Sequence, residues 1–398
     1  MNIKLKRELT LLELTLIGIG TIVGAGIYVL IGIGASLAGN ALWLSFLLAS
    51  FVAIFSGLSY AKLSFLFPKN SAEYLYIKKA FNEDLALATA VLVILSSLVG
   101  ASVVSKGFAE IFTGVSQSLL KGELDISSTL VAIILILFCC TFLLLGIRES
   151  ALLSTTATIF SILGLLAIIF FSIPYIGRDN LLLIKNPLGI FEASSLVFFA
   201  FIGFESIPRL SEEAKNARKD VPLAIILSII ITGILYTIVA ISAISTIGAD
   251  NLAISKNPLG EVAYSIFGSY GLLVVSFFGL FATFSTTFLI LLSTSRMIYG
   301  IAEQKVFPKF FLKISKNRRT PYNSILFVGL VSILFTLFKS LKSLAMLTDF
   351  FILTVFLLVN LSLIKIIMKA SNKIRISDFV LPLIGAIFCI ILLLSTKT

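Results

Sequence analysis

Eleven apolar segments, each long enough to cross a lipid bilayer as a helix, constrain this chain more than any other feature of its sequence. Hydrophobic residues make up 58% of its 398 residues and charged residues only 13%, a balance outside the range of soluble domains. Because a helix needs about 20 apolar residues to span the hydrocarbon core, the sequence predicts an all-α integral membrane protein with about 11 transmembrane helices. The segments lie at about 11–37, 41–67, 85–114, 128–146, 151–176, 191–212, 222–248, 265–301, 322–340, 344–368 and 378–396.

Lysine and arginine residues are distributed unevenly over the loops between these segments. If the N-terminus is cytoplasmic, 20 of them fall in inner loops and seven in outer loops. Basic loops stay on the cytoplasmic side. The sequence therefore predicts a multi-pass protein of the plasma membrane with a cytoplasmic N-terminus and, because the number of spans is odd, an extracellular C-terminus. Residues 1–398 offer no hydrophilic stretch long enough for a separate soluble domain.

The chain carries a net charge of +11, but no nucleic-acid partner is expected, because the basic residues are scattered over short loops. Enzyme chemistry and metal binding are disfavoured as well. The sequence contains no histidine and none of the common catalytic motifs, and its three cysteines (Cys139, Cys140 and Cys389) lie in apolar runs without metal-ligand spacing. We expect a protein that is not an enzyme and that uses no cofactor.

The first apolar segment contains four glycines within nine residues, Gly18, Gly20, Gly24 and Gly26. Each glycine in a helix interior costs about 1 kcal/mol relative to alanine. Unwound backbone is tolerated in a membrane only where it is buried in protein or lines a wet cavity. The pattern therefore indicates a helix broken near the bilayer midplane. Close helix packing through Gly20 and Gly24 is the alternative, and the glycines alone leave both interpretations open.

The sixth segment is interrupted in a similar way, by Gly203 and Pro208. Glu205 lies between them at membrane depth, where an ionisable side chain is costly and usually functional. The alternative is that Glu205 lies near the inner end of the helix and pairs with Arg209 four residues later.

The two interrupted segments lie five spans apart, so the halves of the chain that contain them run in opposite directions. That arrangement is typical of inverted-repeat transporters, in which the substrate binds between two discontinuous helices. A half-helix N-terminus offers free N–H groups to an anion, and unwound carbonyls accept hydrogen bonds from an ammonium group. The two ends of an amino acid fit these two functions.

Several stretches resemble the amino acid–polyamine–organocation (APC) superfamily of transporters. They are residues 7–10 and 18–28 (Gly-Ile-Gly-Thr-Ile-Val-Gly-Ala-Gly-Ile-Tyr), residues 198–205 running on through 212–222, and, more briefly, residues 67–76 and 295–308. The resemblance implies the leucine-transporter-like fold, a five-plus-five inverted repeat worked by alternating access. We expect the first repeat at about 8–176, the second at about 190–369 and an extra helix at about 377–396.

The resemblance also implies a substrate site at the two helix breaks. In such proteins the carboxylate of an amino acid meets backbone N–H groups of the first break, and its ammonium group meets carbonyls of both breaks. The matching residues are Ile22, Gly24, Ala25, Gly26 and Ile27 in the first break and Phe199, Ala200 and Ile202 in the second. Phe199 would close over the substrate, and Glu205 matches a carboxylate that takes part in gating or proton sensing.

A coupling-ion site is implied by the same resemblance. Some proton-coupled members carry a lysine on the fifth helix, where this chain has Ser161. Sodium-coupled proteins of this fold bind the ion with oxygens that match Gly20, Val23, Ala282, Ser285 and Thr286. The alternative is that these hydroxyls bond back to their own helix. Coupling to Na⁺, coupling to H⁺ through Glu205, and exchange without an ion all stay open.

The expected function is secondary active transport of an amino acid, driven by H⁺ or Na⁺. An amino acid or polyamine exchanger and a substrate-binding nutrient sensor on the same fold are the alternatives, and no oligomeric state is indicated. A neutral amino acid is favoured, because the side chains expected around the pocket are small or apolar. They are Ser102, Ser105, Phe204, Phe284 and Phe288. Lys106 is a weak indication of an anionic substrate, since it could also extend toward the bilayer surface.

Overall fold

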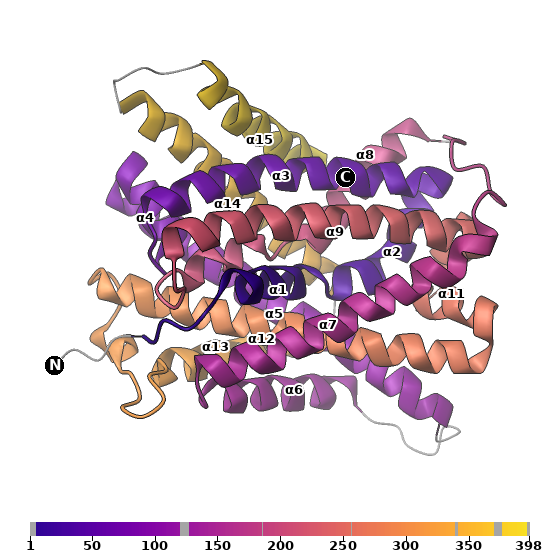
Figure 1. The fold of residues 1–398 in the computed structure, drawn as a ribbon, viewed down its shortest axis with the longest axis horizontal. Helices are drawn as coiled ribbons and strands as arrows, with labels where there is room; N and C mark the ends of the chain where they lie inside the picture. Colours follow the sequence, from indigo (N-terminus) through magenta and orange to yellow (C-terminus); the bar gives the residue numbers. More distant parts are fainter. Residues whose placement is uncertain are drawn as a thin grey trace.

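The computed structural model describes residues 5–119, 127–184, 186–255, 257–338, 341–369 and 376–395. Within these ranges every regular element is a helix, apart from an isolated parallel bridge between Leu9 and Ala214. In Figure 1, α3 (Leu42–Leu66) and α9 (Ala217–Ile247) lie side by side along the long axis. The predicted all-α membrane fold is confirmed.

The helices account for all eleven predicted segments. In the described part of the chain, seven stretches are long and apolar enough to span a membrane, and four shorter apolar helices accompany them. The remaining helices of the first half are α1 (Leu11–Ile22), α2 (Ala25–Ala38), α4 (Ala72–Ala80), α5 (Glu83–Leu119), α6 (Ser128–Leu143) and α7 (Ile147–Ser172). Those of the second half are α8 (Pro187–Val197), α10 (Ala249–Ile254), α11 (Pro258–Phe267), α12 (Ser269–Glu303), α13 (Tyr322–Thr336) and α14 (Leu341–Lys369), followed by α15 (Ile376–Ser395). Short 3-10 turns lie at η1 (Gly39–Ala41), η2 (Ile173–Tyr175) and η6 (Lys309–Leu312).

The structure differs from the predicted segments between the spans. The apolar run at 265–301 is not one helix, because Gly268 adopts φ +65° and separates α11 from α12. Hydropathy cannot detect such a turn, since apolar residues continue on both sides of it. The connecting helices α4 and α10 are too short to stand out in the sequence.

Several basic residues assigned to outer loops lie outside the described residues, namely Lys121, Lys185, Lys256, Lys339 and Lys397.

The contacts between helices follow the exchange that an inverted repeat requires. Helix α3 packs on α9, α5 on α12, and α6 on α13. The contact of α1 with α9 has its counterpart in the contact of α8 with α3, and the contact of α5 with α14 has its counterpart in that of α12 with α7. The pattern is that of two equivalent halves, with α15 packed outside them on α14 and α3. The boundaries of the two repeats stay a prediction.

The first predicted break is present, because α1 ends at Ile22 and α2 begins at Ala25. The close-packing interpretation holds as well. A Cβ atom added to Gly18 would lie 2.8 Å from Cβ of Ser228, and one added to Gly20 would lie 2.9 Å from Oγ of Ser285. The glycines therefore both interrupt the helix and bring its backbone against α9 and α12.

The second predicted break is also present. Helix α8 ends at Val197, and the chain continues through three 3-10 helices, η3 (Phe198–Phe201), η4 (Phe204–Ser206) and η5 (Pro208–Leu210). Between the first two, Gly203 has φ +144°, a conformation that side chains with a Cβ atom rarely adopt. A Cβ atom there would lie 2.8 Å from the carbonyl carbon of Thr21. Gly203 thus holds the second break against the end of α1.

Replacing Gly203 by alanine is expected to lower the free energy of unfolding by about 2–3 kcal/mol, from backbone strain and from the clash with Thr21. Thermal unfolding of the purified protein in detergent measures the loss. Gly114→Ala in α5 is the matched control, since a Cβ atom there meets nothing within 4 Å. Equal melting temperatures for the two variants would contradict the role given to Gly203.

The chain before α1 is tied to the loop that follows the second break. The backbone N–H groups of Glu8 and Leu9 donate to the carbonyl of Glu213 at 2.9 and 3.0 Å. The carboxylate of Glu213 lies 3.2 Å from Nε of Arg296 on α12. Both side chains are fully buried. Burial raises the pKa of the Glu213 carboxyl group, and the Arg296 guanidinium opposes this rise. Three parts of the chain are therefore fixed together at the end of the bundle where α1 begins.

Candidate substrate site

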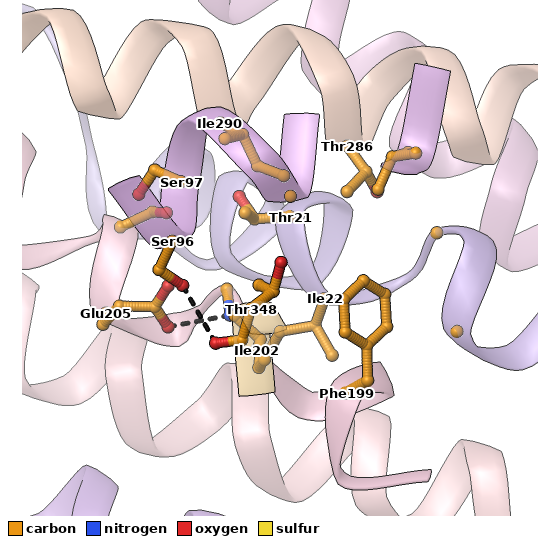
Figure 2. Close-up of a pocket in the computed structure, with 16 residues that line it drawn as sticks. Thr21, Ile22, Ser96, Ser97, Phe199, Ile202, Glu205, Thr286, Ile290 and Thr348 are labelled. Carbon is orange, nitrogen blue, oxygen red and sulfur yellow. Dashed lines mark hydrogen bonds between the residues drawn. The ribbon is translucent and has the colours of Figure 1, made fainter. Parts of the chain in front are cut away.

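A small cavity of about 30 Å³ lies where the two helix breaks meet (Figure 2). We call it the central cavity. A volume of this size holds one or two water molecules and is smaller than an amino acid. It is lined by Thr21, Ile22, Gly24, Gly26, Ser96, Ser97, Gly100, Val104, Phe199, Ile202, Gly203, Glu205, Ser206, Thr286, Ile290 and Thr348.

Most of the predicted substrate residues meet at this cavity. Ile22, Gly24 and Gly26 line it from the first break, and Phe199 and Ile202 line it from the second. Three predicted residues do not line it, namely Ala25, Ile27 and Ala200. Ala200 nevertheless lies directly against Gly26, because a Cβ atom added to Gly26 would overlap its Cα and Cβ atoms. Glycine at position 26 is what lets the two breaks touch.

The N-terminal end of α2 faces the central cavity. Its N-cap is Gly24, which has no side chain to cap the helix, and both Gly24 and Gly26 line the cavity. The first N–H groups of an α-helix have no acceptor within the helix. Together with the positive end of the helix dipole they form an anion site. The backbone of residues 25–27 can therefore bind a carboxylate.

The C-terminal end of α1 is capped by side chains from other helices. The Thr286 hydroxyl lies 2.7 Å from the carbonyl oxygen of Gly20 and 3.0 Å from that of Val23. The Tyr236 hydroxyl donates to the carbonyl of Ile22 at 2.8 Å. Tyr236 was not predicted, because nothing in the sequence of α9 distinguishes it from a core residue. Each carbonyl keeps a second lone pair, so the carbonyl of Ile22 can still accept a hydrogen bond from an ammonium group.

The predicted cation ligands come together only in part. The Thr286 hydroxyl lies within hydrogen-bond distance of the carbonyls of Gly20 and Val23, so these three oxygens do lie together. The hydroxyl of Ser285 instead lies 3.0 Å from the Thr158 hydroxyl.

The other two predicted cation residues are not joined to this group. The Ser161 hydroxyl donates to the carbonyl of Ala157 on its own helix at 2.9 Å. Ala282 is buried on α12, one turn before Thr286.

Glu205 is buried at the edge of the central cavity (Figure 2). One carboxylate oxygen accepts a hydrogen bond from the backbone N–H of Gly203 at 2.8 Å. The other lies 3.9 Å from Nη2 of Arg209, which contacts Glu73 of α4 more closely, at 2.7 Å. Glu205 therefore lines the cavity and also lies near Arg209, and its role in transport stays a prediction. Glu73 was not predicted, because only the folded chain brings α4 to the second break.

The residues expected to surround a substrate side chain do not line the central cavity, so this expectation was wrong for the present conformation. Ser102 donates to the carbonyl of Ser332 at 2.6 Å, and the ring of Phe204 packs on Phe356. Ser105, Phe284 and Phe288 are also absent from the lining of the central cavity. Lys106 donates to the carbonyl of Phe338.

The reason for this error is the rotation of α5. The face of α5 that borders the cavity carries Ser96, Ser97, Gly100 and Val104, spaced three to four residues apart. Residues that far apart lie on one side of a helix. Ser102 and Ser105 lie on another side, and the rotation of a helix that is apolar all round cannot be derived from its sequence.

Comparison with known proteins identifies the group to which the chain belongs. The sequence profile of the amino acid permease family matches residues 9–396, nearly the whole chain. This chain belongs to the amino acid permease family. Its membership agrees with the resemblance to the APC superfamily and with the two broken helices.

Three relatives illustrate the range of this permease family. The branched-chain amino acid permease BcaP of Bacillus subtilis is 29% identical over 98% of this chain and 88% of its own length. The methylthioribose transporter of the same organism is 27% identical over 97% of this chain and 87% of its own length. The cationic amino acid transporter 5 of Arabidopsis thaliana is 28% identical over 91% of this chain, which spans 65% of that protein's length. All three are named as transporters or permeases rather than enzymes.

Proposed function

We propose that this permease binds one amino acid between its two helix breaks and carries it across the membrane by alternating access. The observation that carries the proposal is the position of the N-terminal end of α2. It faces a cavity whose opposite wall is the interrupted backbone around Phe199 and Ile202. In this arrangement the N–H groups of residues 25–27 bind the carboxylate. The carbonyls of Ile22, Phe199 and Ile202 accept hydrogen bonds from the ammonium group.

A neutral amino acid is the proposed substrate. Five apolar side chains line the cavity together with hydroxyl groups and glycine backbone; they are those of Ile22, Val104, Phe199, Ile202 and Ile290. The acid in that wall, Glu205, already accepts a backbone hydrogen bond and lies near Arg209. The name of the relative BcaP, a branched-chain amino acid permease, supports the same substrate class. A cationic amino acid is the alternative outcome, supported by the names of the plant relatives.

Opening of the central cavity is part of the proposed cycle, because about 30 Å³ is too small for an amino acid. Phe199, which lines the cavity and is almost fully buried, moves to admit the substrate. Glu205 acts as a gating residue. Its bond to the N–H of Gly203 holds the second break in the present conformation, and that bond is released as the break moves.

Coupling to H⁺ rather than Na⁺ is the proposed source of energy. In the present conformation the Thr286 hydroxyl already satisfies the carbonyls of Gly20 and Val23, and Ser285 is bonded elsewhere. A sodium ion would need both hydroxyls to turn toward those carbonyls. Exchange of amino acids without an ion and nutrient sensing are the remaining alternatives.

The proposed location is the plasma membrane, with the N-terminus cytoplasmic and the C-terminus extracellular. The excess of basic residues in the predicted inner loops supports this orientation. The proposed division into repeats of about 8–176 and 190–369 is supported by the exchange of helix contacts between the two halves.

Uptake of labelled leucine into proteoliposomes tests the proposal. The purified protein is compared under an inward H⁺ gradient, under an inward Na⁺ gradient, and in counterflow with leucine on both sides. Accumulation driven by H⁺ is the expected result. Accumulation driven only by Na⁺ would indicate that Na⁺ is the coupling ion and that Thr286 and Ser285 bind it. Counterflow without accumulation would indicate an exchanger. Leucine binding without any transport would indicate a sensor.

Replacing Thr286 by valine is expected to lower the free energy of unfolding by about 1–3 kcal/mol, because the carbonyls of Gly20 and Val23 lose their donor. Thr286→Ser keeps the hydroxyl and serves as the control. The melting temperature is also measured with and without Na⁺. If Na⁺ raises the melting temperature of the native protein but not that of Thr286→Val, the proposed coupling to H⁺ is wrong.

A further inference from the structure

Asp349 is a buried carboxyl group that the transport site does not use. It lies on α14, within the stretch Met346–Lys369 that is apolar enough to span a membrane. Its side chain is 2% exposed. Its Oδ1 atom is buried and has no hydrogen-bond partner in the described part of the chain. A carboxylate in such a place is costly, so its charge needs an explanation.

No charged side chain on the helices packed against α14 pairs with Asp349 in the described residues. These helices are α3, α4, α5, α15 and η3. Lys62 on α3 and Lys79 on α4 are exposed, as are Asp84 and Glu110 on α5. The other charged groups have partners elsewhere: Glu73 with Arg209, Lys78 with Glu83, and Lys106 with the carbonyl of Phe338.

On α14 itself, Lys342 lies seven residues before Asp349, but its side chain is outside the described part of the structure; the described lysines of this helix, Lys365 and Lys369, lie at its opposite end. Lys365 lies over the ring of Phe81, and Lys369 donates to the carbonyl of Ala80. Neither of these two lysines forms an ion pair with Asp349.

The position of Asp349 links it to the second helix break. Thr348, the preceding residue, lines the central cavity, and its carbonyl accepts a hydrogen bond from Ser96 (Figure 2). Phe356, two turns further along the face of α14 that carries Asp349, packs on the rings of Phe198 and Phe204. Asp349 therefore lies on the part of α14 that must move when the second break moves.

We propose that Asp349 is a proton-binding group of the transport cycle. This inference rests on the proposed function and specifies how protons enter it. In the closed conformation the carboxyl group holds its proton, because the described residues offer no counter-charge to a carboxylate and no hydrogen-bond donor to its Oδ1 atom. When α14 and the second break separate, water reaches the group and the O–H proton passes to water. The empty transporter returns with the carboxylate still in contact with water, and the group takes up a proton from water on the other side of the membrane before the substrate-bound site closes.

Glu205 differs from Asp349 in the partners available to its charged form. It accepts the N–H of Gly203 at 2.8 Å and lies 3.9 Å from the Arg209 guanidinium group. Both partners favour the ionised carboxylate, whereas Oδ1 of Asp349 has no hydrogen-bond partner and no charge pairs with Asp349 among the described residues. The proton therefore belongs to Asp349, while Glu205 acts in gating.

Infrared difference spectroscopy of the purified protein in lipid tests the protonation directly. The native protein is expected to show the C=O stretching band of a protonated carboxylic acid at neutral pH. Asp349→Asn, which keeps the size of the side chain, is expected to lose it, and Glu205→Gln is expected to keep it. A band that survives in Asp349→Asn and disappears in Glu205→Gln would overturn the proposal. This measurement needs no substrate, so it is independent of whether leucine is transported.

The pH dependence of leucine uptake tests the link to transport. Uptake by the native protein is expected to vary roughly tenfold between pH 5 and pH 8, because a carboxyl group linked to transport titrates. Uptake by Asp349→Asn is expected to vary less than about twofold, because that group is gone. Asp349→Glu is expected to restore the dependence. An unchanged pH profile in Asp349→Asn would overturn the proposal. Absence of leucine counterflow in the native protein would instead overturn the proposed substrate, and the infrared result would still stand.

Discussion

Replacing Gly26 by valine is expected to abolish leucine binding while the protein remains folded and inserted in the membrane. A side chain at this position overlaps the backbone of Ala200 and pushes the two breaks apart. The carboxylate then loses hydrogen bonds to the N–H groups of α2. At about 1.5–3 kcal/mol for each hydrogen bond to a charged group, losing two corresponds to a rise in the dissociation constant of roughly 100-fold or more. Scintillation proximity binding of labelled leucine measures the change.

Gly114→Val is the matched control for this prediction. Gly114 also lies in a long apolar helix, but a Cβ atom there meets nothing within 4 Å. It borders a second, larger cavity among α2, α5, α11 and α12. Leucine affinity is expected to be unchanged in this variant. Loss of binding in Gly114→Val with normal binding in Gly26→Val would place the substrate in the larger cavity and contradict the proposed site.

Replacing Arg296 by methionine is expected to lower the free energy of unfolding by about 3–5 kcal/mol, because the buried carboxylate of Glu213 loses its counter-charge. The loop after the second break and the segment before α1 depend on this pair, since Glu8 and Leu9 bond to the carbonyl of Glu213. Thermal or denaturant unfolding in detergent measures the effect. Arg318→Met is the control, because its pair with Glu149 is about half-exposed on both sides and is worth about 0–1 kcal/mol.

The loss in Arg296→Met is expected to depend on pH. Burial already raises the pKa of Glu213, and removing the guanidinium removes the influence that opposes this rise. A carboxyl group with a raised pKa in the folded state contributes stability below its unfolded pKa and loses it as pH rises through the folded value. The difference between native protein and variant should therefore shrink as pH falls. A difference that stays constant from acidic to neutral pH would show that Glu213 is not the group left unpaired.

The two helix breaks could be predicted from the sequence, because glycine and proline act locally on the backbone. Gly24 is the N-cap of α2 at the first break, and Gly203 adopts φ +144° at the second. The inverted relation of the two halves followed from the number of spans between the breaks. These features need no knowledge of which helix lies beside which.

The remaining parts of the site depend on tertiary packing and could not be predicted. Tyr236 caps the carbonyl of Ile22 from a residue more than 200 positions away, within an unremarkable apolar run. Glu73 reaches Arg209 from a short connecting helix. The side of α5 that faces the cavity was predicted wrongly for the same reason, since Ser96 and Ser102 look alike in the sequence. Asp349 is visible as an acid in the sequence, but only the structure shows that its Oδ1 atom has no hydrogen-bond partner among the described residues.

A structure of the protein with leucine bound, determined by cryo-electron microscopy, tests the central claim most directly. The account predicts density for the amino acid between the two breaks, with the central cavity enlarged. Its carboxylate should lie about 3 Å from the backbone nitrogens of residues 25–27, the distance of a hydrogen bond. Density in the larger cavity beside Glu110 and Glu261, with an empty space between the breaks, would contradict the account.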